Sequence, residues 1–137
     1  MSMPETGLET VRLGPDARVQ LTTLKRRTGI GNWNVLCRWA FCMSLADPTP
    51  IRKLKEHGGT GVEMTWKTFA GEEEELYRAL LIERCKAEHG AADRETMARA
   101  LRQHLDRGIA RLVSQRSAKS IADFIELLVG TQRAVET

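Results

Sequence analysis

The most apolar stretch of the chain runs from Trp33 to Ala46, and its only clearly polar residues are Asn34, Arg38 and Ser44. The apolar residues do not fit one stripe at 3.6 residues per turn, and a helix that is apolar nearly all round is buried. The stretch is too short for a membrane span, which needs about 20 apolar residues. We therefore predict a helix with Asn32 as N-cap, covered by protein that includes a second subunit.

The residues before this helix predict a strand and another helix. Polar and apolar residues alternate from Thr10 to Leu13, as in a short half-buried strand. Pro15 and Asp16 favour a helix start, because proline suits the first turn and an acid suits the positive end of the helix dipole. Gly29 is the predicted C-cap.

The order strand, helix, glycine turn and apolar helix is that of a ribbon–helix–helix module, in which strands from two subunits pair. On that template Arg12 and Thr10 point to DNA, while the amides around Asn32 to Asn34 hold a backbone phosphate. We thus expect a mainly α fold: a small helical domain with a ribbon–helix–helix-like N-terminal half and one or two short strands, forming an oligomer.

The rest of the chain predicts one more strand and three more helices. The strand is expected over Gly61–Phe69, a helix from Glu72 that stops at Gly90, a second after the cap Asp93, and a short last helix from Ser120. The apolar lines are expected to be buried: Met97, Leu101, Leu105, Ile109 and Leu112 in one helix, and Ile121, Phe124, Ile125 and Leu128 in the last. Gly108 predicts a close crossing with another helix. We expect one domain over residues 9–130, with flexible ends at 1–8 and 131–137.

The net charge of +3 is unevenly distributed. Residues 1–70 carry ten Lys/Arg and six Asp/Glu, hence +4, and residues 71–137 carry eleven and twelve, hence −1. This asymmetry suits an anionic partner for the first half. Lys25, Arg26 and Arg27 either complement the end of a helix or bind phosphates, and Arg52, Lys53 and Lys55 form either a second basic patch or a solvated loop. The row Arg99, Gln103, Arg107 and Arg111 is expected to be a solvated face first and a nucleic-acid surface second.

No nucleotide-binding or hydrolase signature occurs in the sequence. The three cysteines include no CxxC pair, and the three histidines are far apart in sequence. We therefore predict no catalytic residue, no metal site and no cofactor. The cysteine usage and the lack of an apolar leader lead us to expect a cytoplasmic protein without a membrane segment.

The segment TLKRRTGIGNWNVLCRWAFCMSLAD resembles the most distinctive part of the DndE family of DNA sulfur-modification proteins. The similarity continues through VEMTWKTFAGE, YRALLIERC and RQHLDRGIARL, and covers roughly residues 9–128. The resemblance implies a small helical homotetramer that binds duplex DNA, with a preference for nicks, through a lysine-rich surface. It also implies partner proteins: a cysteine desulfurase or equivalent, an adenylating reductase-like protein and a coiled-coil ATPase.

The implied DNA surface maps best onto Lys25, Arg26 and Arg27, although this chain has more arginines than lysines. Arginine binds phosphates at least as well. We expect a non-catalytic component of DNA phosphorothioation that binds the duplex backbone. The alternatives are a ribbon–helix–helix repressor or antitoxin, a DNA-nicking subunit, and a scaffold without DNA affinity of its own.

Overall fold

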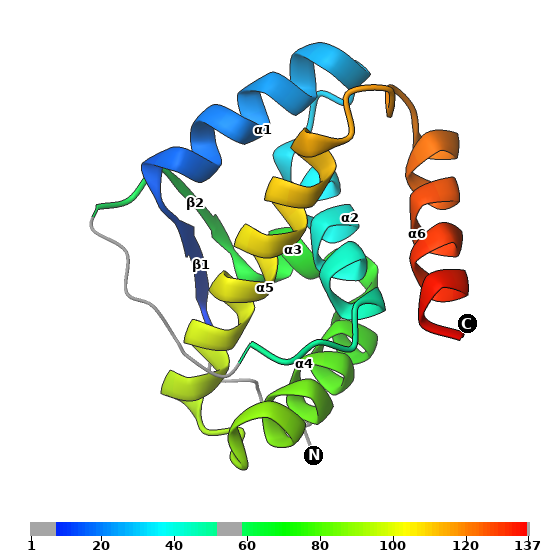
Figure 1. Ribbon diagram of the computed structural model, residues 1–137. Coiled ribbons are helices and arrows are strands. Elements are labelled where there is room, and N and C mark those ends of the chain that lie inside the picture. The colour runs from blue at the N-terminus through cyan, green and yellow to red at the C-terminus, as the bar shows by residue number, and fades with distance from the viewer. Residues whose placement is uncertain (1–7, 52–58, 137) are drawn as a thin grey trace.

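The computed structural model describes residues 8–51 and 59–136, and the side chains up to residue 130. It shows a mainly helical fold with one small antiparallel sheet (Figure 1). The elements in chain order are β1 Thr10–Leu13, α1 Pro15–Thr28, α2 Trp33–Ala46, β2 Val62–Thr65, α3 Trp66–Ala70, the 3-10 helix η1 Gly71–Glu73, α4 Glu74–His89, α5 Arg94–Ser114 and α6 Ile121–Glu136.

The helix ends agree with the sequence signals. Gly29 and Gly90 end α1 and α4 in the left-handed conformation, where a side chain would strain the backbone. Asp93 caps α5 by accepting a hydrogen bond from the Thr96 amide. Asn32 occupies the N-cap position of α2, as predicted, but its side chain makes no capping bond.

The two strands belong to one chain. β1 pairs with β2 in antiparallel register, with Val11 opposite Met64 and Leu13 opposite Val62. The ribbon–helix–helix template instead expected β1 to pair with the same strand of a second subunit. One edge of β1 is therefore occupied by β2 of the same chain, and pairing with a second subunit stays a prediction.

The second strand is shorter than predicted. It ends at Thr65, whose hydroxyl oxygen accepts a hydrogen bond from the Thr68 amide and so caps α3. The predicted strand over Gly61–Phe69 therefore becomes a strand followed by a helical turn. Trp66 and Phe69 are buried in the core, as their apolar character favours.

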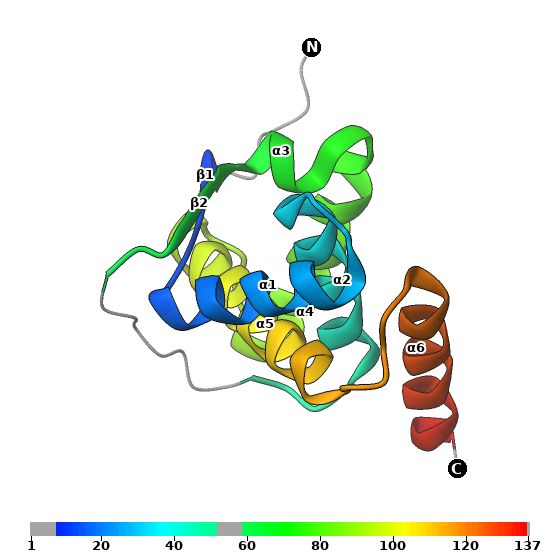
Figure 2. The same cartoon turned by 90° about the horizontal axis from the view of Figure 1, so that it is seen from above.

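Helix α2 lies at the centre of the molecule. Every residue in it is buried or half-buried within this single chain, and Leu36, Cys37, Ala40 and Phe41 are fully enclosed. Helix α5 crosses it along one side, with α1, α3 and α6 around it (Figures 1 and 2). The expected burial is confirmed. The expected second subunit is not required, because helices of the same chain supply the cover.

The close crossing predicted at Gly108 is present. A Cβ atom built on Gly108 would lie 1.8 Å from the carbonyl oxygen of Ala40 in α2. Only a residue without a side chain permits this approach, and the obstacle is backbone that cannot swing aside. Gly108 therefore sets the distance between the two central helices.

Arg107 and Arg111 of α5 bind to the C-terminal end of α2 and the residues that follow it. Arg107 donates to the Ser44 hydroxyl at 2.8 Å, to the Ser44 carbonyl at 2.8 Å and to the Thr49 carbonyl at 2.7 Å. Arg111 forms an ion pair with Asp47. The predicted solvated face is thus wrong for these two residues and for Gln103, which is buried. Arg99, paired with Glu95 at 2.7 Å, lies on the partly exposed side.

A buried polar network joins α2, α4 and α5. The Ser44 hydroxyl lies 2.7 Å from Nδ1 of His104, whose Nε2 lies 2.6 Å from Glu88. Because the ionised Glu88 carboxylate can only accept, His104 donates to it from Nε2, and Nδ1 of the neutral ring accepts from the Ser44 O–H. Glu88 also accepts from Arg84 at 3.0 Å and from the Ile51 amide.

The network sets the charge states of its members. Burial lowers the pKa of His104, and Glu88 opposes this only in part. Burial alone would raise the pKa of Glu88, but the Ile51 amide, His104 and Arg84 hold that pKa below its usual value. Burial likewise opposes, without overcoming, the hydrogen bonds from Arg111 and Thr49 that hold the pKa of Asp47 low.

The last helix departs from prediction in two ways. It continues to Glu136, whereas the sequence indicated a loose tail after Gly130. Phe124 is buried against Trp39, with ring centroids 5.7 Å apart, but Ile121 and Ile125 are 46% and 49% exposed instead of buried. Figure 2 shows the cause: α6 lies at the edge of the molecule, so only one of its sides meets other helices.

Replacing Gly108 with Ala should destabilise the fold by at least about 1–3 kcal/mol, because the added methyl group overlaps backbone atoms of α2. Gly130→Ala is the matched control, since nothing lies within 4 Å of the position that a Cβ atom would take there. That change should be neutral or stabilise α6 by about 0.5–1 kcal/mol. Urea unfolding measures both variants, and equal stability of the two would contradict the close crossing.

Stability should fall as the pH drops below the ordinary His pKa of 6.5. The pKa of His104 is lower in the folded protein than in the unfolded chain. As the pH drops, the unfolded chain therefore binds a proton that the folded protein does not, and this shifts the equilibrium toward unfolding. The low pKa values of Glu88 and Asp47 contribute losses only below their ordinary values of 4.5 and 3.8.

Urea unfolding at pH 7.5 and 5.5 measures this dependence. His104→Gln should flatten it, whereas His89→Gln, which changes a histidine outside the network, should preserve it. An unchanged dependence in His104→Gln would refute the assignment.

Candidate nucleic-acid interface

The end of α1 carries the basic tripeptide singled out in the sequence. Lys25 and Arg26 are exposed in the last turn, where positive charge complements the negative end of the helix dipole. Neither has an ion-pair partner among the described residues. Both cations are therefore available to an external anion.

Arg27 has a structural role instead. Its guanidinium donates to the carbonyls of Leu112, Val113 and Gln115 at 3.5, 3.1 and 3.3 Å, at the C-terminal end of α5. These carbonyls include groups that a helix end leaves without an intrahelical partner. Arg27 is half-buried and connects α1 to α5 through these hydrogen bonds. Of the three consecutive cations, only Lys25 and Arg26 are exposed.

A surface hollow of about 400 Å³ lies beside Lys25, at the start of α2. Asn32 is exposed there, and Asn34 donates to the Thr68 carbonyl at 3.2 Å. Arg18 lies over the Trp33 ring, 5.9 Å from its centroid. The residues that line the hollow are Lys25, Gly31, Asn32, Trp33, Asn34, Val62, Glu63, Met64 and Thr68.

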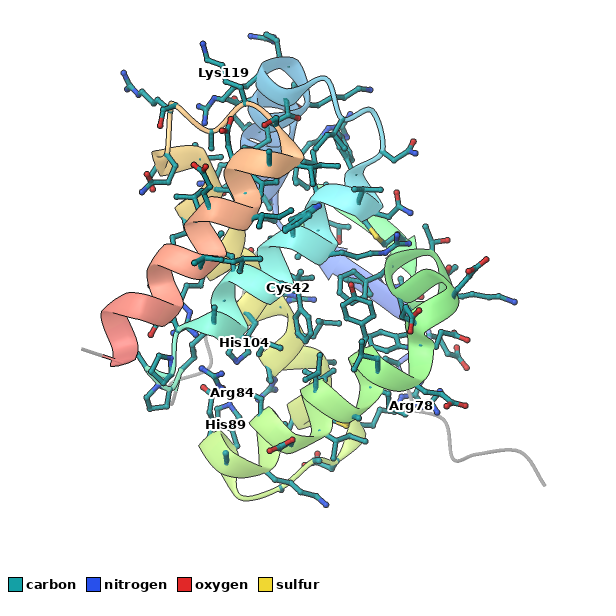
Figure 3. The ribbon with its side chains drawn as sticks, turned by 90° about the vertical axis from the view of Figure 1, so that its right-hand side faces the viewer. Cys42, Arg78, Arg84, His89, His104 and Lys119 are labelled. Atoms are coloured by element: carbon teal, nitrogen blue, oxygen red, sulfur yellow. The ribbon has the colours of Figure 1, made fainter. Side chains whose placement is uncertain are left out.

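Two further cations, which the sequence reasoning missed, lie at the same end of the molecule. Arg116 and Lys119 are exposed in the connection from α5 to α6, and the Arg27 bonds hold the start of this connection against α1. Figure 3 shows Lys119 beside the end of α1 and His89 at the opposite end. We call Lys25, Arg26, Arg116 and Lys119 the cationic end.

The signal for Arg116 and Lys119 was a pair of cations three residues apart just after a helix end. Nothing in the sequence placed that connection beside α1, which lies about 90 residues earlier in the chain. The contact that brings them together is Arg27, a residue that sequence reasoning assigned to phosphate. The cationic end is therefore a tertiary feature.

The remaining predicted residues lie elsewhere. Arg12 is exposed on β1 and faces Glu63 of β2 at 3.6 Å, so an acid shares the outer face of the ribbon. Arg52, Lys53 and Lys55 fall outside the described residues. The structure places Lys25 and Asn32 at one hollow, and Arg12 lies on the ribbon, paired with Glu63, which lines the same hollow.

Two sets of chemically reactive residues are buried or half-buried. Ser44, His104 and Glu88 have the order of a hydrolase triad, but Ser44 and His104 are 0% and 1% exposed. A nucleophile needs access to its substrate. Burial raises the pKa of Cys37 to about 12 and also raises the pKa values of Cys42 and Cys85. All three cysteines are thus neutral thiols at physiological pH.

Metal-binding and membrane-spanning features are absent from the described ranges 8–51 and 59–136. There, no three histidine, cysteine, aspartate or glutamate residues gather as a metal ion would require. None of the helices in that part of the chain has the length and apolar character to cross a membrane.

Comparison with known proteins places the chain in a family. No curated protein matches it significantly. The family model described as DNA sulphur modification protein DndE matches residues 10–120, which extend from β1 to the connection after α5 and leave out α6. This match covers most of the 137 residues and includes Lys25, Arg26, Arg116 and Lys119. The chain belongs to the DndE family of DNA sulphur modification proteins.

Proposed function

We propose that this protein is a non-catalytic, DNA-binding component of the DNA phosphorothioation machinery. Family membership indicates involvement in DNA sulfur modification. The single observation that supports DNA binding is the cationic end, where four exposed cations gather from two separate segments. Such a surface attracts the phosphate backbone and releases counterions on binding.

The binding we propose is to the backbone and not to base sequence. The cations lie at helix ends and in a connection, and these are positions that contact phosphates and fix register. The outer face of the ribbon is less suited to read bases, because Glu63 accompanies Arg12 there. This arrangement favours backbone binding over the alternative of a ribbon–helix–helix repressor or antitoxin.

A preference for nicks follows from the same surface as a further part of the proposal. A nick lets the duplex bend, so its phosphates can approach cations on two segments at once. The hollow beside Lys25 offers space next to these cations. In this proposal the chain works with the reductase-like and ATPase proteins of the modification system, and does not cut DNA itself.

We also propose that the protein acts in the cytoplasm as a homotetramer. Helix α2 is buried or half-buried within its own chain, so we place the contact between copies on another surface. The outer side of α6 offers exposed apolar side chains at helical spacing, namely Ile121, Ile125 and Val129. Assembly would multiply the cationic ends and raise the effective concentration of contacts. The mass of the full chain in solution tests this part.

Replacing both Lys25 and Arg26 with Ala should weaken duplex binding and flatten its salt dependence. Each lost phosphate contact should reduce the slope of log affinity against log salt by about 0.9. Lys86→Ala, which removes an exposed cation of α4, is the control and should change neither quantity. Filter binding across a salt series with intact, nicked and random-sequence duplexes measures the effect.

Three outcomes would contradict the proposal. An unchanged salt slope in the double variant would move the site away from the cationic end. A dependence of about 1–3 kcal/mol on single base pairs would indicate base reading. Open circles formed from supercoiled plasmid with magnesium, and lost on mutation, would reveal a nicking activity.

A further inference from the structure

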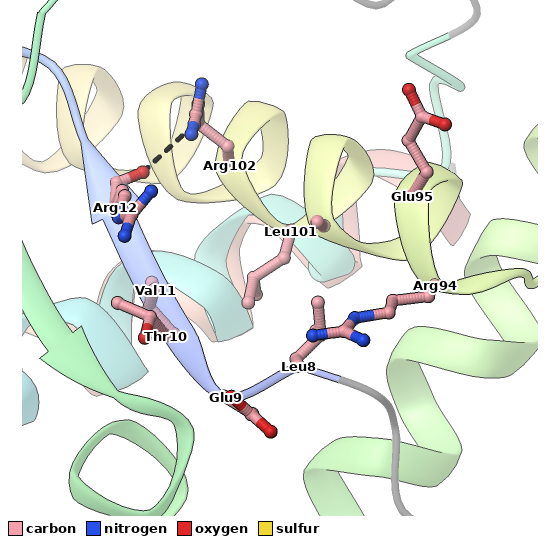
Figure 4. A pocket seen from close by; sticks show the side chains of 10 residues that line it. Leu8, Glu9, Thr10, Val11, Arg12, Arg94, Glu95, Leu101 and Arg102 are labelled. Carbon is pink, nitrogen blue, oxygen red and sulfur yellow. Dashed lines mark hydrogen bonds between the residues drawn. The ribbon is translucent and has the colours of Figure 1, made fainter.

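A groove of about 490 Å³ runs between β1 and the first half of α5, away from the cationic end (Figure 4). One wall is the edge of β1 that does not pair with β2. The other wall is the exposed side of α5 near its start. The residues that line it are Leu8, Glu9, Thr10, Val11, Arg12, Arg94, Glu95, Ala98, Leu101 and Arg102.

The strand edge in this groove presents peptide groups. The Trp66 amide donates to the Glu9 carbonyl at 3.0 Å in the β1–β2 register, and peptide groups alternate in direction along a strand, so those of Glu9, Val11 and Leu13 face β2. The peptide groups of Thr10 and Arg12 therefore face the groove. The Arg12 carbonyl confirms this direction, because it accepts a hydrogen bond from Arg102 of α5 at 2.9 Å.

Thr10 offers a backbone donor and an acceptor on this edge. Within the described residues, no hydrogen bond to these two groups is found. An open strand edge of this kind is a template for another extended chain. Because the Arg12 carbonyl already accepts from Arg102, Thr10 supplies the open donor and acceptor of this edge, which can exchange two hydrogen bonds with one residue of such a chain.

The groove has an apolar floor and a positively charged rim. Val11 and Leu101 are 3% and 2% exposed and form the floor. Arg12, Arg94 and Arg102 stand at the rim, and of these Arg12 is already paired with Glu63 at 3.6 Å. Of the two acids, Glu95 is paired with Arg99 at 2.7 Å. The rim is therefore positive on balance, and Figure 4 shows Arg94 extending across the groove below Leu101.

We propose that this groove binds an extended, acidic peptide segment of a partner protein, which pairs with the open peptide groups of Thr10 on the edge of β1. A groove between a strand edge and a helix is the geometry of strand addition, where main-chain hydrogen bonds give affinity and side-chain pockets give specificity. Alternate residues of the segment pack on Val11 and Leu101, and the acidic residues between them pair with the arginines.

A peptide fits this groove better than a nucleic-acid backbone does. The Thr10 carbonyl needs an N–H donor, and a phosphate offers only acceptors. This inference concerns a surface separate from the cationic end, so it stands or falls independently of DNA binding.

The test uses the full-length protein and a blocked peptide of alternating Glu and Val residues. Amide chemical shifts of the protein are followed by NMR, and affinity is measured by fluorescence anisotropy. Binding should shift the amides of Thr10 and Arg12 while leaving those of Lys25 and Arg26 in place. N-methylation of the peptide amides that face β1 should weaken binding at least about tenfold, because it removes main-chain donors.

Two protein variants separate charge from fold. Arg94→Glu should weaken the acidic peptide by at least about tenfold and improve binding of a Lys–Val peptide, since Arg94 is an exposed residue without an ion-pair partner among the described residues. Lys86→Glu makes the same charge change on α4 and should leave both affinities unchanged.

Clear results would overturn the proposal. Absence of shifts at Thr10 and Arg12 would do so, as would binding that tolerates both N-methylation and Arg94→Glu. Displacement of the peptide by duplex DNA, with the same two amides shifted by DNA alone, would assign the groove to nucleic acid instead.

Discussion

The packing of α2 against α5 is the constraint on which the rest of the structure depends. Gly108 lets the two helices meet at backbone distance, and Arg107 fastens the end of α2 through the Ser44 carbonyl. Because α2 is fixed at its middle and its end, its start is fixed too. The turn from α1 into α2 is then held in place, and with it the exposed side chains of Lys25 and Arg26.

Arginine has two distinct roles in this fold. Arg27, Arg84 and Arg107 donate to backbone carbonyls at the ends of helices and the connection after α2. A guanidinium suits this work, because its five donors can satisfy several carbonyls at once. Arg26 and Arg116 lack such partners among the described residues and stay on the surface. The net charge of the chain therefore does not show which arginines are available to an external partner.

The sequence predicted local structure well because local signals act over a few residues. Glycines at 29 and 90, the cap at Asp93 and the apolar line from Met97 to Leu112 each specify a helix end or face within one or two turns. The close crossing at Gly108 was also predicted, since an unfavoured glycine in a long helix implies a packing reason.

The sequence did not predict which distant segments contact one another in the fold. The burial of α2 was predicted, but periodicity does not say which helix supplies the cover, and the cover proved to come from the same chain. The arginine row on α5 was assigned to solvent because its acceptors are carbonyls around Ser44 to Thr49, which lie about 60 residues away. Residues of the cationic end were found only in part for the same reason. The assignment of Arg12, Arg52, Lys53 and Lys55 to DNA stays a prediction.

Enclosure of α2 by its own chain is the feature to test first. Hydrogen exchange of the α2 amides at decreasing protein concentration, followed from the largest assembly to the monomer, tests it most directly. We expect strong protection of the amides from Leu36 to Phe41 that does not change on dilution, because α5 and its neighbours remain in place. Protection that falls as the copies separate would instead show that α2 is shared between subunits.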